Sequence, residues 1–454
     1  MTSNGWGLGH LSRQIAIALA VGDDADVTMF SFSRGLPLVT EFGLRGEFCP
    51  GYDSPWIPGE RWNSYVERRF QHFVSESRPD VVLFDGVAPY VGILNALLDF
   101  PSISAGWLRR GMWLRRRTEQ LTKSSAFDFV VEPGDLASEA DHGPTSRLDS
   151  VRVPPVSLLE VVPLLDREGA AAELGLDPDL PALLFALGPG QPADPFDARK
   201  VALHEALEHD AWQVGVVSSP LAPADAATAP NGVQLRGVYP LLRYLGAFDA
   251  AVSAAGYNSV HELIPAGVPS LLVPKSASRT DDQFARAAFL ADRRLAMMAP
   301  DDNLALVRER TIALLGAEGK ELRESLSRID RGGMIGGATE VARILTSSPP
   351  TGVRETGREE WRQPGLKGML KRIIGPRGVK LVQRALGRAP PRPPRHRVSL
   401  DPVPDADPAH LLFTSDLAVV SSASNQPVEH VLPGASDTYR QARRELLDEF
   451  YDVV

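Results

Sequence analysis

The chain has a single cysteine, Cys49, among its 454 residues. One thiol cannot build a disulfide framework or a thiolate metal site, so both are excluded and a reducing compartment is favoured. Long apolar runs are also missing, and none approaches the roughly 20 residues that a membrane-spanning helix needs. The first apolar run, residues 15–21, follows a glycine-rich segment and not the basic stretch of a signal peptide. We expect a cytoplasmic protein, either free or peripheral on the inner face of the membrane.

Basic residues are outnumbered over most of the chain but concentrate in one stretch. The net charge is −9, yet residues 358–397 carry 12 Lys and Arg against two acidic residues, a local net charge of about +10. Apolar residues recur there at helical spacing, which is typical of short basic helices that lie on anionic membranes. The alternative is that this stretch packs on the acidic remainder of the same protein.

Short apolar strands alternate with helical segments over the first three quarters of the chain. Residues 27–32 and 81–84 have the apolar character of buried strands, and residues 11–20 have helical spacing. The same alternation starts again with a strand at residues 182–187, after a proline-marked linker. Such alternation predicts parallel sheets covered by helices. We therefore expect an α/β protein with two facing, doubly wound Rossmann-like domains.

The predicted domain organisation has four parts. An N-terminal Rossmann-like domain spans residues 1–155, and a C-terminal Rossmann-like domain spans residues 156–346. A basic linker rich in proline, glycine and arginine covers residues 347–398, and a segment with a terminal helix covers residues 399–454. The last two parts form a C-terminal extension that we expect to be partly disordered.

One motif in the second half places a strand, a glycine turn and a helix in succession. Ser253 ends the strand, and Gly256 makes the turn. Asn258 and Ser259 then stand at the helix N-terminus, where free N–H groups and the helix dipole favour an anion, usually a phosphate. Glu262, one turn further on, would accept hydrogen bonds from the vicinal hydroxyls of a ribose. The alternative is that Asn258 and Ser259 only cap the helix.

A second element of this motif is the loop that ends in Asp282 and Gln283. A carboxylate beside an amide supplies both acceptors and donors, which suits the hydroxyl groups of a sugar. The alternative is a charged loop without a ligand.

The order and spacing of these residues resemble the donor-binding signature of the GT-B nucleotide-sugar glycosyltransferases. The matching segments are Gly256-Tyr-Asn-Ser, Glu262, Gly267-Val-Pro, Pro274 and Asp282-Gln283. The signature is similar both to the UDP-glycosyltransferases of plants and macrolide pathways and to the peptidoglycan N-acetylglucosaminyltransferase family. The plant enzymes have a phosphate-binding histidine before the glycine turn, where this chain has Ser253-Ala254. The likeness is therefore greater to the peptidoglycan branch.

This resemblance covers roughly residues 4–345 and implies roles for the matched positions. In these families the helix N-terminus holds the diphosphate, the glutamate holds the ribose, and the Asp–Gln pair holds the sugar. A second glycine loop lies on the phosphate side, and backbone groups near Val238 clasp the base. The resemblance thus implies donor-binding roles for Gly188, Gly190, Gln191, Val238, Ser253, Gly256, Asn258, Ser259, Glu262, Asp282 and Gln283.

A glycine-rich segment, residues 5–9, precedes His10 at the start of the first helix. Glycines allow a backbone to approach a ligand closely. Gly7 and Gly9 match the Gly-x-Gly-His loop of the same family, which contacts the acceptor side of the site. His10 would accept the proton of the acceptor hydroxyl, with Asp85 at the end of a strand as its partner. The alternatives are a tight turn, a structural histidine and an aspartate that caps a turn.

Arginines and tryptophans interleave between residues 107 and 117. Such a surface binds anions and lies at interfaces. Trp107, Arg109, Arg110 and Trp113 are therefore predicted to contact an acceptor or a membrane, with a solvated face as the alternative. No nucleic-acid motif accompanies these residues, so we expect no nucleic-acid partner.

These features predict an inverting glycosyltransferase that moves a hexose or N-acetylhexosamine from a UDP-sugar to a lipid-linked or other membrane-proximal acceptor. We expect no metal and no other cofactor, because a helix N-terminus can stabilise the departing diphosphate. Two alternatives stay open. One is a UDP-sugar 2-epimerase of similar shape, which would need further acid–base carboxylates. The other is a sugar-nucleotide-binding protein without turnover.

The first strand of the N-terminal domain is short in this sequence. Only residues 1–4 precede the glycine-rich segment, whereas a buried central strand has about five or six residues. A glycine-rich ligand loop normally joins the first strand to the first helix. We therefore expect that translation starts roughly five to fifteen residues upstream, which N-terminal peptide analysis of the native protein would test.

Overall fold

The computed structural model describes residues 1–347 except 4–7, 53–56, 58–60, 116–117, 189–197, 219, 222–231 and 277–279. The predicted basic linker and C-terminal segment lie outside the described residues, so both stay predictions. The described chain divides into two compact units. The first contains Met1–Gly51, Ser77–Pro89 and the described residues from Ser102 onward, and the second contains the described parts of Tyr52–Glu76 and Tyr90–Pro101.

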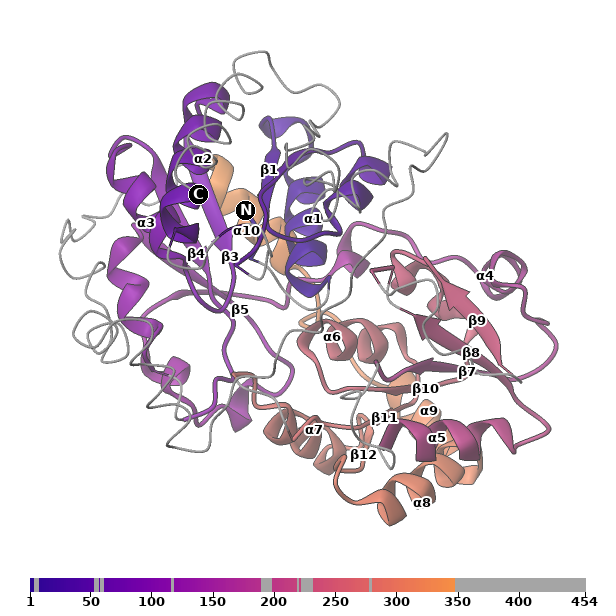
Figure 1. Ribbon diagram of the computed structural model, residues 1–454. Helices are drawn as coiled ribbons and strands as arrows, with labels where there is room; N and C mark the ends of the chain where they lie inside the picture. Colours follow the sequence, from indigo (N-terminus) through magenta and orange to yellow (C-terminus); the bar gives the residue numbers. More distant parts are fainter. Residues whose placement is uncertain are drawn as a thin grey trace, which may run out of the picture. The chain divides into compact units, whose positions relative to one another are not determined.

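All strands of the first unit pair in parallel within two groups (Figure 1). The strands of the N-terminal group are β1 (Thr28–Ser31), β2 (Arg45–Phe48), β3 (Val81–Asp85), β4 (Ser104–Leu108), β5 (Phe129–Pro133) and β6 (Val151–Val153). The strands of the C-terminal group are β7 (Ala182–Ala186), β8 (Gln213–Ser218), β9 (Val233–Arg236), β10 (Ala250–Ser253), β11 (Ser270–Leu272) and β12 (Met297–Met298). The C-terminal sheet has the order β12-β11-β10-β7-β8-β9.

The first three residues lie between β1 and β3. Thr2 makes parallel bridges to Ser31 and to Asp85. The Thr2 N–H donates to the Phe30 carbonyl at 3.0 Å, and the Asp85 N–H donates to the Met1 carbonyl at 2.9 Å. This short segment therefore joins β1-β2 to β3-β4-β5-β6 at the place where the sequence predicts a longer first strand. The upstream start stays a prediction.

Helices connect the strands, as the alternation in the sequence predicts. Those of the first unit are α1 (Gly9–Val21), α4 (Arg167–Leu174), α5 (Ala198–Leu207), α6 (Tyr257–Ala266), α7 (Gln283–Asp292), α8 (Leu304–Leu315), α9 (Ala317–Ser327) and α10 (Gly337–Ser347). The helices α2 (Trp62–Ser77) and α3 (Val91–Leu98) supply the second unit. Within the part of the chain that the structure describes, no helix is long and apolar enough to cross a bilayer.

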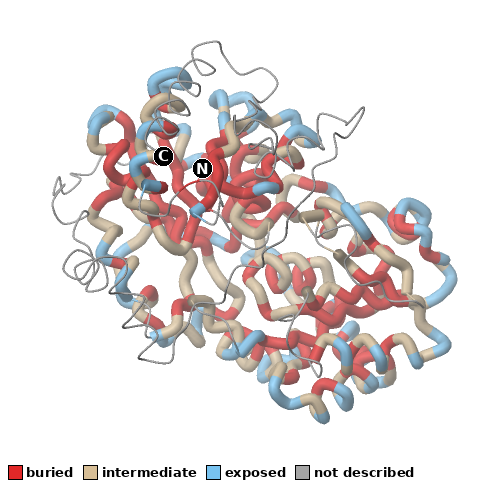
Figure 2. The backbone as a smooth tube through the Cα atoms, viewed as in Figure 1, coloured by how far each residue is buried: buried red, intermediate tan, exposed pale blue. Residues whose placement is uncertain are grey.

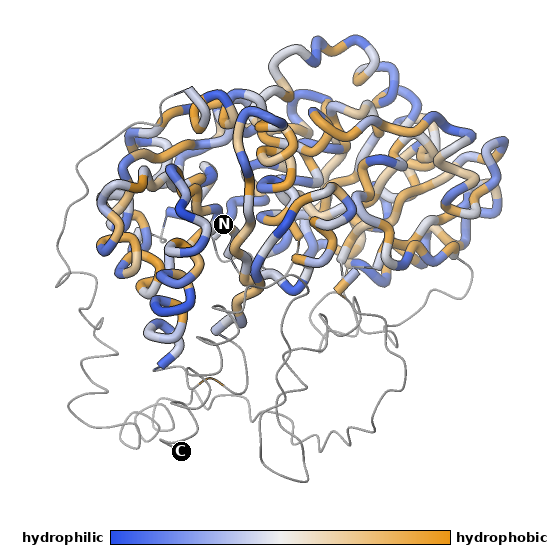
Figure 3. The backbone as a smooth tube through the Cα atoms, turned by 90° about the horizontal axis from the view of Figure 1, so that it is seen from above, coloured by the Kyte–Doolittle hydropathy of each residue, from blue (hydrophilic) through white to orange (hydrophobic). Residues whose placement is uncertain are grey.

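The C-terminal sheet is buried on both faces. Along β7, Ala182 and Leu184 belong to one apolar cluster, whereas Leu183 and Phe185 belong to another. Successive side chains of a strand point to opposite faces, so a continuous apolar run is what a covered parallel strand requires. Figure 2 shows buried residues along the strands, and Figure 3 shows hydrophilic residues interrupting the hydrophobic ones along the helices. The predicted α/β class with parallel sheets is confirmed.

The last described helix returns to the first. α10 packs against α1, although the predicted boundary assigns α10 to the C-terminal domain. Its start is fixed by Glu160, whose carboxylate accepts hydrogen bonds from the N–H groups of Gly336, Ala338 and Thr339 at 3.1, 2.9 and 2.7 Å. A carboxylate at this position satisfies helix N–H groups that have no partner within the helix, and it also complements the helix dipole.

Replacing Glu160 by alanine is expected to lower the free energy of unfolding by about 1–2 kcal/mol, because three N–H groups lose their acceptor. Urea denaturation would measure the loss. The exposed Glu321, on α9, provides a matched Glu→Ala control that should leave the unfolding midpoint almost unchanged. Equal midpoints for the two variants would show that the Glu160 cap does not stabilise the fold.

Candidate functional site

The N-terminus of α6 lacks a side-chain cap. Gly256 takes the cap position with φ −71° and ψ 154°, and no side chain among the described residues caps the first helical N–H groups. A Cβ atom placed on Gly256 would meet no described atom within 4 Å. Within the described chain, the hydroxyl group of the half-buried Ser259 makes no hydrogen bond. Uncapped N–H groups beside open space are the features that bind an anion at a helix N-terminus.

Glu262 lies one turn further along α6 and is half-buried. Its carboxylate makes no hydrogen bond or ion pair with any residue that the structure describes. Burial raises the pKa of Glu262 to about 8. A partly buried carboxyl group without a partner is costly for the folded protein, and the hydroxyl groups of a ligand would offset that cost.

The Asn258 side chain is used within the protein. Its Oδ1 accepts a hydrogen bond from Arg13 Nη1 at 3.0 Å, and its Nδ2 donates to the Gly9 carbonyl at 3.3 Å. Both ends of the Asn258 side-chain amide contact α1. Only the backbone N–H of Asn258 is therefore left for the predicted donor-binding role. Gly9, predicted on the acceptor side, is the residue that Asn258 packs against.

Asp282 and Gln283 stand at the start of α7 and make local contacts. Asp282 Oδ1 accepts from the Ala285 N–H at 3.0 Å, so the helix-capping role that the sequence left open is present. Gln283 Oε1 accepts from the Lys275 N–H at 3.1 Å. Capping engages one carboxylate oxygen of Asp282 and one end of the Gln283 amide, which is compatible with a ligand at the other groups.

The other predicted donor-site residues follow the strands of the C-terminal sheet. Gly188 comes after β7, and the described atom nearest to a Cβ there would be Lys275 Nζ, at 4.0 Å. Val238 is half-buried and follows Gly237, whose φ of 67° favours glycine. Ser253 is buried and donates to the Ala254 carbonyl at 3.2 Å, so its hydroxyl shapes the turn. The predicted Gly7, Gly190 and Gln191 lie outside the described residues.

The structure brings His10 and Asp85 together. His10 Nδ1 lies 2.7 Å from Asp85 Oδ1, and the His10 side chain is 15% exposed. His10 Nδ1 also lies 2.7 Å from Arg13 Nη2. The carboxylate can only accept and the guanidinium can only donate, so Nδ1 pairs with Asp85 in the tautomer that carries its proton there and with Arg13 in the other tautomer. Burial is the main factor that lowers the pKa of His10. Burial alone would raise the pKa of Asp85, but the Arg13 guanidinium and His10 outweigh it and lower this pKa to about 2.

Four residues were predicted to form a surface that contacts an acceptor or a membrane. Three of them are buried, so the prediction is wrong for these three. Trp107, Arg109 and Trp113 are only 0%, 1% and 3% exposed. Trp107 belongs to β4, an interior strand between β3 and β5, and its Nε1 donates to the Gly86 carbonyl at 2.8 Å. Arg109 extends that strand and pairs with Glu132 at 3.3 Å. Only Arg110 is partly exposed, and it lies 3.9 Å from Asp281.

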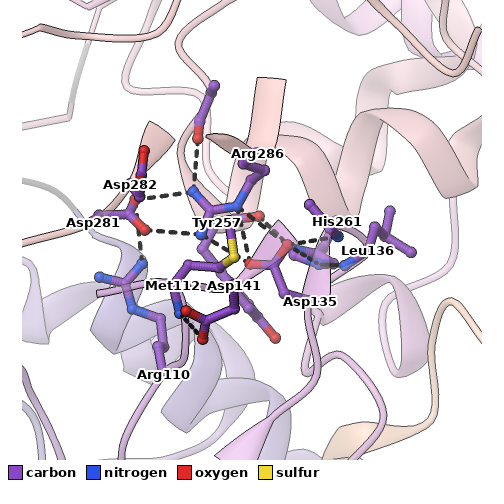
Figure 4. A network of polar contacts seen from close by, with 12 residues as sticks. Arg110, Met112, Asp135, Leu136, Asp141, Tyr257, His261, Asp281, Asp282 and Arg286 are labelled. Carbon is purple, nitrogen blue, oxygen red and sulfur yellow. Dashed lines mark hydrogen bonds and ion pairs between the residues drawn. The ribbon is translucent and has the colours of Figure 1, made fainter. Parts of the chain in front are cut away.

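A network of buried charges centres on Arg286 of α7 (Figure 4). Its guanidinium pairs with Asp135, which follows β5, and with Asp281, both at 2.8 Å. Arg110 approaches Asp281 as well. This network was not predicted from the sequence. A signal was available, since Arg286 occupies the same face of α7 as the buried Ala287 and Leu290, where a charge requires a partner.

His261 and Tyr257 on α6 belong to the same network. His261 Nδ1 donates to the Tyr257 carbonyl at 2.6 Å, and Nε2 accepts from the Leu136 N–H at 3.0 Å. With both nitrogens engaged in these roles the imidazole is neutral, and burial lowers its pKa. The Tyr257 hydroxyl donates to the Gly134 carbonyl and accepts from the Val156 N–H, both at 3.0 Å. These contacts fix the position of α6.

The segment after β4 pairs with the segment before α7. Trp113 forms an antiparallel bridge with Asp281, and the Asp282 N–H donates to the Met112 carbonyl at 2.8 Å. Met112 has a left-handed φ of 58°, and its N–H donates to Asp141 at 2.8 Å. The start of α7 is therefore held by residues from the N-terminal half.

No group of three or more His, Cys, Asp or Glu side chains in the described part of the chain is placed to hold a metal ion.

Residues 238–321 match the model of the glycosyltransferase family 28 C-terminal domain. Two curated proteins are similar to this chain, and both are named UDP-N-acetylglucosamine--N-acetylmuramyl-(pentapeptide) pyrophosphoryl-undecaprenol N-acetylglucosamine transferase. The protein from Bordetella petrii is 28% identical over 245 residues, 50% of this chain and 61% of that protein. The protein from Leuconostoc mesenteroides is 28% identical over 162 residues, 34% of this chain and 43% of that protein. The chain thus spans about half the length of these relatives.

Two solved structures have a similar fold. A putative UDP-N-acetylglucosamine 2-epimerase from Listeria monocytogenes has a TM-score of 0.55 at 10% identity, with 77% of this chain and 97% of that chain covered. The glycotransferase of kitacinnamycin has a TM-score of 0.51 at 15% identity, with 76% and 97% covered. At such identities the likeness shows the fold alone. With the family 28 match, it confirms the predicted GT-B fold and the resemblance to nucleotide-sugar glycosyltransferases.

The Glu262 carboxyl is expected to make UDP binding depend on pH. Ribose hydroxyls donate to the ionised form, so binding favours loss of the proton from a group whose pKa in the free protein is about 8. Affinity should therefore rise as the pH increases from 7 to 9. Calorimetry with UDP would measure this rise and the accompanying proton release.

Two variants complete that measurement. Glu262→Ala should weaken UDP binding by about 1.5–3 kcal/mol. Glu262→Gln keeps the shape of the side chain but cannot ionise, so it should abolish the pH dependence. Wild-type affinity in Glu262→Ala would remove this residue from the donor site.

Proposed function

We propose that this chain is an inverting glycosyltransferase that moves a hexose or N-acetylhexosamine from a UDP-sugar to a lipid-linked or other membrane-proximal acceptor. The observation that carries the proposal is the half-buried Glu262 carboxylate, which has no partner among the described residues. It lies one turn from the uncapped N-terminus of α6, and both features fall within the family 28 match. A carboxylate and an anion site at this spacing suit the ribose and the diphosphate of one nucleotide.

The proposed donor lies along the carboxyl edge of the C-terminal sheet. The N–H groups at Asn258 and Ser259 bind the diphosphate, and Glu262 binds the ribose hydroxyls. Asp282 and Gln283 then face the sugar with the groups that capping leaves available. This is the binding mode expected where a helix N-terminus follows a strand of a doubly wound sheet.

The proposed reaction is a single displacement at the anomeric carbon. The acceptor hydroxyl attacks opposite the diphosphate, so a new C–O bond forms as the bond to the diphosphate oxygen breaks. The departing electron pair stays on UDP, where the α6 N-terminus stabilises the charge. The hydroxyl proton passes to His10 Nε2 in the tautomer whose Nδ1 proton faces Asp85. The lowered pKa of His10 keeps its imidazole neutral near pH 7.

A lipid-linked acceptor is supported by the names of the two curated relatives, which describe transfer to an undecaprenol-linked substrate. We propose that this chain works at the inner face of the membrane and that residues 358–397 attract it to anionic lipids. That stretch lies outside the described residues, and its local charge supports this part of the proposal.

A UDP-sugar 2-epimerase is the second candidate, because the putative epimerase from Listeria monocytogenes shares the fold. Epimerisation needs carboxylates that gain and lose protons. Asp85, Asp135 and Asp281 instead pair with arginines at 2.8 Å. The pKa values of all three are lowered, since the arginines outweigh the effect of burial. This pairing favours transfer.

Incubation of the protein with a panel of UDP-sugars and membrane lipid extracts would test the function by mass spectrometry. Transfer is expected to persist in EDTA, because the helix N-terminus stabilises the leaving group. His10→Ala should lower turnover by about 10²–10⁴-fold with little change in UDP affinity. Replacement of the exposed His204 by alanine is the matched control. Conversion of the UDP-sugar to its 2-epimer without transfer would establish the epimerase instead.

Membrane attachment has its own test. Deleting residues 358–397 should abolish sedimentation with anionic vesicles and leave UDP binding intact. Salt should weaken the attachment of the full chain, because it screens the attraction between basic residues and headgroups. Vesicle binding that persists in the deletion variant would assign the membrane contact to another part of the chain.

A further inference from the structure

Arg13 lies beside His10, with its Nη2 atom 2.7 Å from His10 Nδ1. It lies on α1, and its side chain is only 2% exposed. Its Nε and Nη2 atoms donate to the two oxygens of Asp85 at 3.0 and 2.8 Å. Its Nη1 donates to Asn258 Oδ1 at 3.0 Å, and its guanidinium lies 5.3 Å from the centre of the Tyr257 ring. One buried cation therefore contacts both the partner of His10 and the first turn of α6.

The double hydrogen bond fixes the orientation of the Asp85 carboxylate. A bidentate arginine leaves a carboxylate little freedom to rotate, so Asp85 Oδ1 stays 2.7 Å from His10 Nδ1. In the tautomer that the proposed function uses, this contact holds the Nδ1 proton and leaves Nε2 as the acceptor. Without Arg13, the Asp85 carboxylate would keep, among the described residues, only its hydrogen bond to His10 and could rotate between several orientations.

The guanidinium also balances the charge around the imidazole. The charged groups that influence His10 are Asp85 from β3, Arg13 from α1, and Arg110 from the segment after β4. The carboxylate favours the protonated imidazole, whereas both arginines oppose it. With Arg13 in place, Asp85 orients His10 without holding an additional proton on it.

The link to α6 runs through a neighbour of the proposed phosphate site. Asn258 precedes Ser259 in the first turn of that helix. Because Asn258 Oδ1 accepts from Arg13 while Nδ2 holds the Gly9 carbonyl, a displacement of α6 would pull on both ends of the His10 segment. Arg13 therefore contacts both the donor helix, through Asn258, and the partner of the histidine, Asp85.

We propose that Arg13 is a positioning residue that couples His10 to the donor helix, since it clamps Asp85 with one edge of its guanidinium and holds Asn258 with the other. This inference rests on the proposed function for its catalytic consequence. The influence of Arg13 on the pKa of His10 can be measured without any transfer reaction.

Arg13→Gln is expected to raise the pKa of His10 by about one pH unit or more, because the Asp85 carboxylate then stabilises the imidazolium without a competing cation. Arg13→Lys keeps the charge but loses the bidentate geometry, so the pKa should stay near the wild-type value. NMR titration of ¹⁵N-histidine-labelled protein would measure it. A His10→Gln spectrum would assign the His10 resonance among the nine histidines.

The kinetic readouts follow from the same argument. The acid limb of kcat/KM should move to higher pH in Arg13→Gln by the same amount as the NMR titration and stay in place in Arg13→Lys. In the lysine variant kcat should fall by roughly 10–100-fold with little change in donor KM, because the histidine is mispositioned while the donor site is intact. Asn258→Ala, which leaves the Arg13–Asp85 pair in place, should lower kcat and leave the pKa of His10 unchanged.

Thermal unfolding would show that each variant is folded before its spectrum is interpreted. If Arg13→Gln does not fold, Arg13→Lys and Asn258→Ala still test the positioning role, because both should lower kcat while the NMR pKa of His10 stays near the wild-type value. An unchanged pKa of His10 in a folded Arg13→Gln protein would overturn the proposal. So would wild-type kcat in Arg13→Lys. A protein that shows the NMR shift but transfers no sugar would retain the coupling and contradict only the proposed function.

Discussion

The parallel direction of both sheets determines where the polar residues of the site lie. In a parallel sheet the carboxyl ends of the strands share one edge, and ligands bind beyond it. Asp85 ends β3, and Asp135 follows β5. In the C-terminal sheet, β10 leads through Gly256 into the uncapped start of α6. Groups from distant parts of the sequence therefore meet although none of them is close to another along the chain.

Such a meeting of charges in a buried place is costly unless the charges pair. Arg13 offsets Asp85, and Arg286 offsets Asp135 and Asp281. Buried pairs of this kind contribute little net stability, but removal of one partner leaves an uncompensated charge. The pairing thus fixes which side chains stay ionised, and it leaves Glu262 as the carboxyl near α6 that has no described partner. The hydroxyl groups of a ligand would supply the missing hydrogen-bond partners of that side chain.

Local sequence patterns predict the strands, the helices and the glycine turn before α6, because each depends on neighbouring residues. They do not reveal that Arg13 reaches Asp85 72 residues away, or that Arg286 reaches Asp135 151 residues away. The arginines and tryptophans of residues 107–117 show that a pattern can also predict a site wrongly. Their composition suggests a surface, but β4 is an interior strand, so Trp107 and Arg109 are buried. Composition alone does not indicate which strand is interior.

The proposed function requires that one nucleotide occupies the start of α6 and Glu262 together. A crystal structure of the protein with UDP would show whether it does. We expect the diphosphate within hydrogen-bond distance of the N–H groups of Asn258 and Ser259, with both ribose hydroxyls on the Glu262 carboxylate. A nucleotide bound elsewhere, or one whose ribose leaves Glu262 without a partner, would contradict it.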